Sequence, residues 1–160
     1  MSRPKVDTNG VDALTDAVLT ASRLLVAISA RSLAAVEETI TLPQFRMLVL
    51  LDSRGAMKLT TIAELLDVNP STATRMVDRL VMTEMIARQQ NPAVRREVVI
   101  ELTAEGRRVV RGVTRRRRAA IGRIVAKMSG DERRDLVQAL TAFTEAGGEP
   151  SVTAADLGWI

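Results

Sequence analysis

Residues 62–80 read IAELLDVNPSTATRMVDRL, and this segment sets the architecture of the chain. A short apolar helix over residues 59–66 is broken at Asp67 and Val68, and Asn69 followed by Pro70 opens a second helix. Asparagine caps a free backbone N–H at a helix start, and proline fits the first turn. The second helix has a buried stripe of Ala73, Met76, Val77, Leu80 and Val81, and an outer surface of Ser71, Thr72, Thr74, Arg75 and Arg79. Two short helices with a tight break, the second polar outside, predict a helix-turn-helix.

A β-hairpin is predicted directly after the second helix. Residues 86–90 are typical of one strand, and in residues 97–102 Val98, Ile100 and Leu102 alternate with residues of the other face. The turn between the strands carries Arg95 and Arg96. A hairpin with a basic turn, placed after a helix-turn-helix, predicts a winged helix-turn-helix over residues 41–103.

Long helices are predicted on both sides of this unit, over residues 11–40 and 104–147. In the first, residues spaced alternately by four and three form a heptad seam of Leu14, Val18, Ala21, Leu25, Ile28, Ser32 and Ala35. Leu24 and Leu33 lie off the seam, so the helix has more than one apolar face to bury. It therefore needs a partner helix, which a second chain could supply. Capping-box spacing marks further helix starts at Thr41, Thr61 and Ser129. The predicted fold is mainly α with a small β-hairpin wing, between a flexible arm (residues 1–10) and a C-terminal tail (residues 148–160).

The composition excludes several classes of function. The chain has 160 residues and contains no Cys, His or Tyr. This removes disulfides, thiol chemistry, the usual zinc and haem ligands and the commonest general base, so we expect neither an enzyme nor a bound metal or cofactor. The longest aliphatic run, residues 47–51, is far shorter than the roughly 18 residues of a membrane span. No signal-peptide core follows the N-terminus, so we expect a cytoplasmic protein without a membrane partner.

Positive charge is concentrated in one segment. The net charge is only +4, but residues 95–127 hold 11 basic and 3 acidic side chains, a net charge of +8. The remaining residues hold 12 basic and 16 acidic side chains, a net charge of −4. Such a local excess of arginine is typical of a surface that binds a polyanion.

At this level the chain resembles the MarR family of bacterial transcription regulators. The resemblance spans roughly residues 11–147, and its most specific stretches are LPQFRMLVLL (42–51), IAELLDVNPSTATR (62–75), MVDRL (76–80) and LTAEG (102–106). One position departs from the family pattern. The wing of the family usually carries an Asp before its arginines, and Val94 stands there in this chain, followed by Arg95 and Arg96. The resemblance leaves open how Arg96 is held without that acid.

The resemblance implies a homodimer whose dimer region contains the first, fifth and sixth helices. The residues expected at the interface are Leu14, Val18, Ala21, Leu136 and Leu140. It also implies that the winged helix-turn-helix binds palindromic double-stranded DNA. A small ligand, often an aromatic acid or a drug-like compound, would bind between the dimer region and the DNA-binding part and change the spacing of the two DNA-binding parts. We therefore expect a sequence-specific, ligand-responsive transcriptional regulator that acts as a repressor.

Seven residues are predicted to contact DNA: Ser71, Thr72, Thr74, Arg75, Arg79, Arg95 and Arg96. Arg75 has the paired donors that read guanine O6 and N7 in a major groove, and the wing arginines suit a narrow minor groove. The alternatives are that the Ser and Thr hydroxyls only satisfy the helix start, that Arg79 pairs with Asp78, Glu84 or a wing residue, and that the wing turn is merely solvated.

The basic fifth helix admits more than one interpretation. Arg115–Arg118 point in four directions, about 100° apart, so they cannot all face DNA. We expect ion pairs with acidic residues of the first half or with Glu37 and Glu38, and we expect Arg107 and Arg108 to be the better phosphate contacts. The competing function is a winged-helix protein-interaction module without specific DNA binding, which would show no salt-dependent affinity for duplex DNA.

Overall fold

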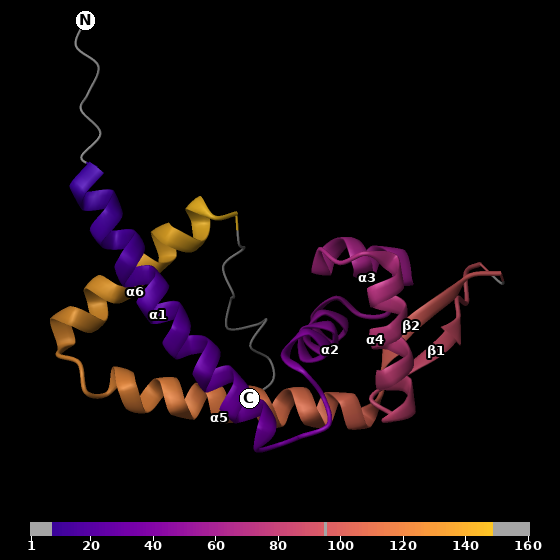
Figure 1. Cartoon of the computed structure of the whole chain (residues 1–160). Coiled ribbons are helices and arrows are strands. Elements are labelled where there is room, and N and C mark those ends of the chain that lie inside the picture. Colours follow the sequence, from indigo (N-terminus) through magenta and orange to yellow (C-terminus); the bar gives the residue numbers. More distant parts are fainter. Residues whose placement is uncertain (1–7, 95, 149–160) are drawn as a thin grey trace, which may run out of the picture.

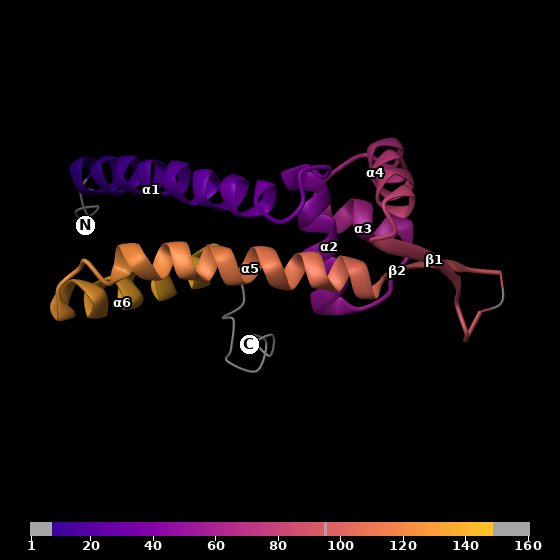
Figure 2. The same ribbon diagram turned by 90° about the horizontal axis from the view of Figure 1, so that it is seen from below.

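Six helices and one antiparallel hairpin make up residues 8–94 and 96–148, which the computed structural model describes. Helices α2, α3 and α4 and the hairpin form one lobe, whereas α1, α5 and α6 extend away from it (Figure 1). Helix α1 crosses α5 obliquely and contacts it near the C-terminal end of α1 (Figure 1 and Figure 2). The elements are α1 (Thr8–Ala34), α2 (Leu42–Arg54), α3 (Leu59–Leu66), α4 (Pro70–Met82), β1 (Ile86–Gln90), β2 (Val98–Leu102), α5 (Ala104–Val125) and α6 (Gly130–Ala146). The predicted fold class, mainly α with a hairpin wing, is confirmed.

Local capping chemistry fixes most of the helix starts. Thr41 and Gln44 form the predicted capping box of α2, in which Gln44 Oε1 accepts from the Thr41 N–H at 2.8 Å. Ser129 and Glu132 form another at α6, with 2.7 Å between the Ser129 nitrogen and Glu132 Oε2. That contact with the Ser129 backbone, followed by a hydrogen bond from the Ser129 side chain, lowers the pKa of the Glu132 carboxyl. These caps satisfy N–H groups that the helices leave unpaired at their starts.

Two boundaries differ from the sequence-based expectation at the ends of the long helices. Helix α1 begins at Thr8, inside the predicted flexible arm, because a lone glycine at position 10 costs a helix only about 1 kcal/mol relative to alanine. Helix α5 ends at Val125, four residues before the helix start predicted at Ser129, and the N–H groups of residues 127 and 128 bond three residues back in a tighter turn. Residues 1–7 and the tail from residue 149, including Trp159, lie outside the described residues.

The predicted capping box at Thr61 is wrong. Helix α3 spans Leu59–Leu66 as predicted, but its N-cap residue is Lys58, which makes no side-chain cap. A backbone pairing with a distant residue comes just before the helix. Met57 exchanges two hydrogen bonds with Ile100 of β2, at 3.1 and 2.8 Å, and so adds a single bridge to the edge of the hairpin. This pairing fixes the chain just before Leu59, so the helix begins there.

The apolar core lies within the lobe and extends along the first half of α5. Val109, Val110 and Val113 bring α5 into this core, and Leu33 brings the end of α1. The hairpin is anchored at its base, where Ile100 and Leu102 are buried, whereas Val98 at its outer end is exposed. The largest fully buried side chains are Met47, Leu48, Leu51, Ile62, Val77, Leu80, Met85, Ile86, Val109, Val110 and Val113.

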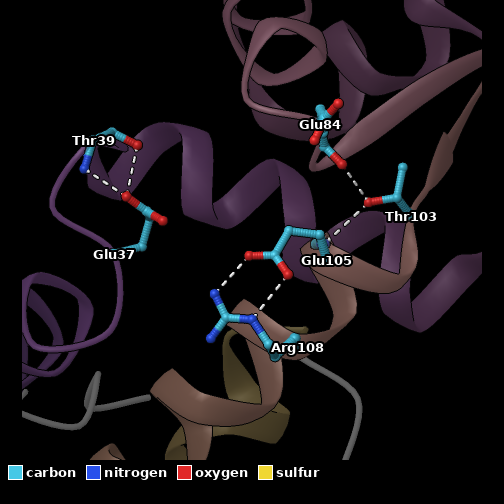
Figure 3. Close-up of polar contacts among 7 residues, drawn as sticks. Glu37, Thr39, Glu84, Thr103, Glu105 and Arg108 are labelled. Carbon is cyan, nitrogen blue, oxygen red and sulfur yellow. Dashed lines mark hydrogen bonds and ion pairs between the residues drawn. The ribbon is translucent and has the colours of Figure 1, made fainter.

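Thr103 joins the hairpin to α5. Its hydroxyl donates to the backbone carbonyl of Glu84 at 2.6 Å and accepts from the Gly106 N–H at 3.1 Å (Figure 3). The Thr103 N–H donates to the Met85 carbonyl at 3.1 Å. Gly106 lies so close to that carbonyl that a Cβ built on it would be 2.1 Å from the Met85 oxygen. The start of α5 is thereby pinned to the turn between α4 and β1.

Helix α1 is buried only near its C-terminal end. Ile28, Ser32 and Leu33 are buried, and this part of the helix contacts α5. Toward the N-terminus of α1, large apolar side chains are exposed to solvent, and Leu14 is 63% exposed. Helix α6 has no buried residue. Its exposed apolar side chains are Leu136, Val137, Leu140 and Phe143.

Candidate nucleic-acid interface

The turn between α3 and α4 is built from local backbone and side-chain bonds. Asp67 adopts the left-handed conformation, with φ 54° and ψ 50°, and the Val68 N–H donates to the Ala63 carbonyl at 3.0 Å. Asn69 then caps α4 by accepting from the Thr72 N–H at 2.9 Å. A side-chain cap and Pro70 in the first turn hold the start of α4 in a fixed direction. Side chains on this turn of the helix are therefore presented from a rigid base.

Helix α4 divides into an inner and an outer surface as predicted. Its inner side chains, Ala73, Met76, Val77 and Leu80, are buried in the core of the lobe. On the outer side Ser71, Thr74, Arg75 and Arg79 are exposed, and Thr72 is half-buried. The residues predicted to contact DNA therefore face away from the core.

The short hydroxyl side chains of α4 donate their protons within the helix start. Ser71 Oγ donates to Asn69 Oδ1 at 2.8 Å, and Thr74 Oγ1 donates to the Pro70 carbonyl at 2.9 Å. A hydroxyl that donates locally keeps its lone pairs free to accept. Ser71 and Thr74 therefore present acceptors, and the donor groups on this surface belong to the arginines.

Arg75 and Arg79 are free to bind a ligand. Within residues 8–94 and 96–148 neither makes an ion pair, so the expected pairing of Arg79 with Asp78 or Glu84 is wrong. Asp78 instead pairs with Arg88 of β1. Both free arginines line a cavity of about 340 Å³ between α4 and the start of α2, and it includes Thr39, Thr41, Gln44, Thr72 and Met76. Two guanidinium groups one helical turn apart form a donor surface for phosphate or base edges.

A polar network holds the wing turn in place of the missing acid at position 94. Glu97 forms an ion pair with Lys58, the N-cap residue of α3, and also accepts from the Asn91 side chain. The Asn91 N–H donates to the Glu97 carbonyl at 2.7 Å, and Asn91 Oδ1 accepts from the Ala93 N–H at 3.0 Å. The hydrogen bond from Lys58, followed by that from Asn91, lowers the pKa of the Glu97 carboxyl. This network was not predicted, because it joins residues 39 positions apart.

The network positions the wing relative to the helix-turn-helix. Val94 and Arg96 are exposed at the turn, and Arg95 lies outside the described residues. The hairpin projects outward from the lobe beyond α4 (Figure 2). Because the Glu97 pKa is lowered in the folded chain, the network is intact at neutral pH, and its contribution is lost as the pH falls through the folded pKa.

Replacing Glu97 with Gln should loosen the wing turn. The change keeps the side-chain length but removes the charge that pairs with Lys58, so amide hydrogen exchange in peptides covering residues 88–98 should become about threefold to tenfold faster. Glu101→Gln is the matched control, because Glu101 is exposed in β2, the strand that follows Glu97, and makes no ion pair within the described residues. Equal exchange in the two variants, measured by mass spectrometry, would contradict a role of Glu97 in holding the wing.

The arginines of α5 behave differently from expectation. Arg107 lies 3.6 Å from Asp52, and Arg108 pairs with Glu105 through two hydrogen bonds of 2.9 and 2.6 Å (Figure 3). Arg115–Arg118 make no ion pair with the described acidic residues. Glu37, expected to serve as a partner, instead accepts from the Thr39 N–H and hydroxyl at 3.0 and 2.7 Å (Figure 3). Ion pairs were expected for Arg115–Arg118 and phosphate contacts for Arg107 and Arg108. The structure shows the reverse for the ion pairs, which Arg107 and Arg108 form.

The predicted interface residues lie on unpartnered apolar surface. Leu14, Ala21, Leu136 and Leu140 are exposed, and Val18 is half-buried. By length and composition, residues 10–34 of α1 would also be sufficient to cross a membrane, with a mean hydropathy of 1.5 in an 18-residue window. This length is not visible in the longest unbroken aliphatic run, residues 47–51, because polar residues interrupt the apolar ones along α1. Arg23 lies near the middle of α1, where burial in a bilayer would cost about 2.5–3.5 kcal/mol.

The described residues contain no group of three or more acidic side chains arranged to hold a metal ion. What they do contain is a capped helix with an arginine surface, a hairpin wing and long flanking helices. This combination defines a winged helix-turn-helix protein.

Known proteins share both the sequence and the fold. The sequence model of the MarR family matches residues 40–98. The HTH-type transcriptional repressor MdtR of Bacillus subtilis is 32% identical over 120 residues, which cover 74% of this chain and 77% of MdtR. The chain belongs to the MarR family of transcriptional regulators.

Solved structures agree with this assignment. RV1404 from Mycobacterium tuberculosis is 59% identical, with a TM-score of 0.81 over 89% of this chain and 97% of that chain. FabT of Streptococcus pneumoniae, solved in complex with DNA, is 18% identical and shares the fold, with a TM-score of 0.74 over 87% of this chain and 98% of that chain.

Proposed function

We propose that this protein is a homodimeric repressor that binds palindromic double-stranded DNA sequence-specifically and is released by a small ligand. The observation that carries the proposal is the pair Arg75 and Arg79, both exposed and free of ion pairs on a capped helix. Its relative MdtR is named a transcriptional repressor, and FabT, which has the same fold, is described in complex with DNA. A target on DNA places the protein in the cytoplasm.

In this proposal α4 enters the major groove and the wing contacts the adjacent minor groove. Arg75 donates two parallel hydrogen bonds to guanine O6 and N7, and Arg79, one turn further along, contacts phosphate. Ser71 and Thr74, whose protons are engaged locally, accept from the amino groups of adenine or cytosine. Thr72 contributes its hydroxyl at the edge of this surface. Arg95 and Arg96 of the wing turn bind within or beside the minor groove.

A second copy of the chain covers the apolar surfaces of α1 and α6. Single chains rarely expose so much contiguous apolar surface unless it is an interface. A two-fold dimer places its two α4 helices on half-sites about 34–36 Å apart, which is why the operator is expected to be palindromic. A second chain packed against α1 also explains why this helix is apolar, without placing it in a membrane.

Fluorescence anisotropy over a salt series tests the proposal, with the duplex upstream of the protein's own gene and a scrambled duplex of equal length. The wild-type protein should prefer the first duplex, and log affinity should fall with log salt by about 0.9 for each phosphate neutralised. Arg75→Ala should weaken specific binding by about 1–3 kcal/mol and leave binding to the scrambled duplex nearly unchanged.

Arg134→Ala is the matched control, because Arg134 is an exposed arginine paired with Asp131 on α6, outside the lobe. It should alter neither affinity nor salt slope by much. Should Arg75→Ala weaken binding to both duplexes equally, Arg75 would be a phosphate contact. Weak, salt-insensitive binding of the wild type to every duplex tried would favour a protein-interaction module instead.

A further inference from the structure

The surface of α5 that faces α1 is a stripe of arginines. The residues of α5 on this surface recur every three or four positions, so they share one side of the helix. Six of them are arginines, and the others are small. The six are Arg107, Arg108, Arg111, Arg115, Arg116 and Arg123. Helix α1 adds a seventh, Arg31, from the opposite wall.

These arginines line two adjoining cavities along α5, one beside the end of α1 and the other beside residues 35 and 36, which follow α1. The volumes are about 410 Å³ and 540 Å³, and both cavities are lined by Ala35 and Arg116, so they form one groove. Cavities of this size hold small-molecule ligands. Among the residues that the structure describes, no acidic and no aromatic one lines either cavity. We refer to it as the arginine groove.

Most of the positive charge in the arginine groove is uncompensated within the described residues. Arg108 pairs with Glu105 (Figure 3), and a guanidinium nitrogen of Arg107 lies 3.6 Å from an Asp52 carboxylate oxygen. The remaining five arginines make no ion pair with a described residue. Like charges aligned along a groove with protein walls repel one another and raise the local concentration of anions. An anion in the groove would remove this repulsion.

The shape and lining of the groove select the kind of anion. A DNA duplex is too wide to enter a cavity of a few hundred Å³, so a small molecule is the better fit. An aromatic monoacid would neutralise one arginine and find no aromatic side chain to stack on. Guanidinium groups bind phosphate through paired, charge-assisted hydrogen bonds. A phosphorylated compound with several negative charges therefore matches the groove.

We propose that the arginine groove binds a small phosphorylated polyanion and that this compound is the ligand that weakens DNA binding. The second part rests on the proposed DNA-binding function and names the chemical class of its ligand. The groove begins at Ala104, where α5 leaves the hairpin, and runs along α5 away from the wing. A bound polyanion lowers the net positive charge close to the lobe and repels the phosphate backbone of DNA. By linkage, DNA weakens polyanion binding by the same factor.

Isothermal titration of the full-length protein with inorganic triphosphate tests the binding itself, without DNA. Ionic strength is held constant with sodium chloride, and sodium salicylate serves as the aromatic monoanion. The expected result is saturable binding of about one triphosphate per chain and at least tenfold weaker binding of salicylate. Equal affinity for both anions, or no saturable triphosphate binding, would overturn the proposal.

Arg116→Gln and Arg118→Gln form a matched pair for locating the site. Arg116 lines both cavities, whereas Arg118 is exposed in the same run of arginines and lines neither. Arg116→Gln should weaken triphosphate binding at least tenfold, and Arg118→Gln by less than twofold. Arg111→Gln, which changes an arginine of the second cavity only, should also weaken binding and guards against a local folding defect at Arg116. Equal effects of all three variants would show that the ion is held only by overall charge.

Two further measurements distinguish an effector site in the arginine groove from a DNA contact and from a subunit contact. If the arginine groove binds the effector, triphosphate should weaken operator binding by wild type and not by Arg116→Gln, at constant ionic strength. Triphosphate binding that leaves operator affinity unchanged would contradict the effector role.

The Arg116→Gln variant without triphosphate tests whether the groove is instead a DNA or subunit contact. If this variant has a lower operator affinity and a smaller salt slope than wild type, or a different mass of assembly, the groove is such a contact and the ligand proposal fails. Absence of any operator binding would count against the proposed function and leave the titration result standing.

Discussion

Replacing Gly106 with Ala should lower the free energy of unfolding by about 3 kcal/mol or more, because the new methyl group has no space. Its Cβ would lie 2.1 Å from the Met85 carbonyl oxygen and 2.6 Å from Leu102 Cδ1. The first neighbour is a backbone atom that already accepts from the Thr103 N–H, so it cannot move without breaking that bond. The start of α5 would have to separate from the turn before β1.

Gly122→Ala provides the matched control in the same helix. No atom outside the local helix backbone lies within 4 Å of the Cβ position at Gly122. Alanine is the better helix former by about 1 kcal/mol, so this variant should be unchanged or slightly more stable. Thermal unfolding measured by circular dichroism should separate the two variants by about 6 °C or more, given about 2–4 °C per kcal/mol for a chain of this size. Similar melting temperatures would contradict the close packing of α5 against the hairpin base.

The double variant Leu14→Asp with Leu140→Asp should be monomeric and should bind operator DNA about 100-fold more weakly or worse. Leu14 on α1 is 63% exposed and Leu140 on α6 is 51% exposed, and neither belongs to the core of the lobe. The lobe should therefore stay folded while two carboxylates oppose burial of the dimer surface. A monomer engages one half-site at a time, so the gain from linking two lobes is lost.

Sedimentation velocity measures the assembly, and anisotropy with the operator duplex measures the binding. Met82→Asp is the control for adding an acidic group to an exposed apolar position, because Met82 is 83% exposed at the end of α4. It should remain a dimer. A double variant that stays dimeric, with an unchanged helical spectrum, would mean that α1 and α6 do not form the proposed interface.

Local chemistry explains why much of the lobe was predictable from sequence. The caps at Thr41, Asn69 and Ser129 bond to groups within three residues, so the residue types alone predict these helix starts. The division of α4 into buried and exposed surfaces follows from helical periodicity alone, and it placed Arg75 and Arg79 on the outside as expected.

Contacts between distant parts of the chain were not predictable in the same way. The ion pair of Lys58 with Glu97 and that of Asp78 with Arg88 depend on how the hairpin folds back onto α3 and α4. The same folding adds the Met57 bridge just before α3, where Lys58 and not Thr61 is the N-cap residue. The arginine groove was hidden for a related reason. Its many arginines gather there because of the side that α5 turns toward α1. The number of charges in the sequence does not show which side that is.

Helix α5 also acts as a lever between the two ends of the molecule. Its 22 residues, at about 1.5 Å of rise each, make a rod of roughly 33 Å. The rod is clamped at the wing end by Thr103 and Gly106 and passes without a break into the region beside α1. A tilt of about 5° at the far end would carry the hairpin through about 3 Å, close to the 3.4 Å between successive base pairs. In the proposed dimer, a small change in how α1 and α5 separate would therefore move each lobe by about one step along DNA.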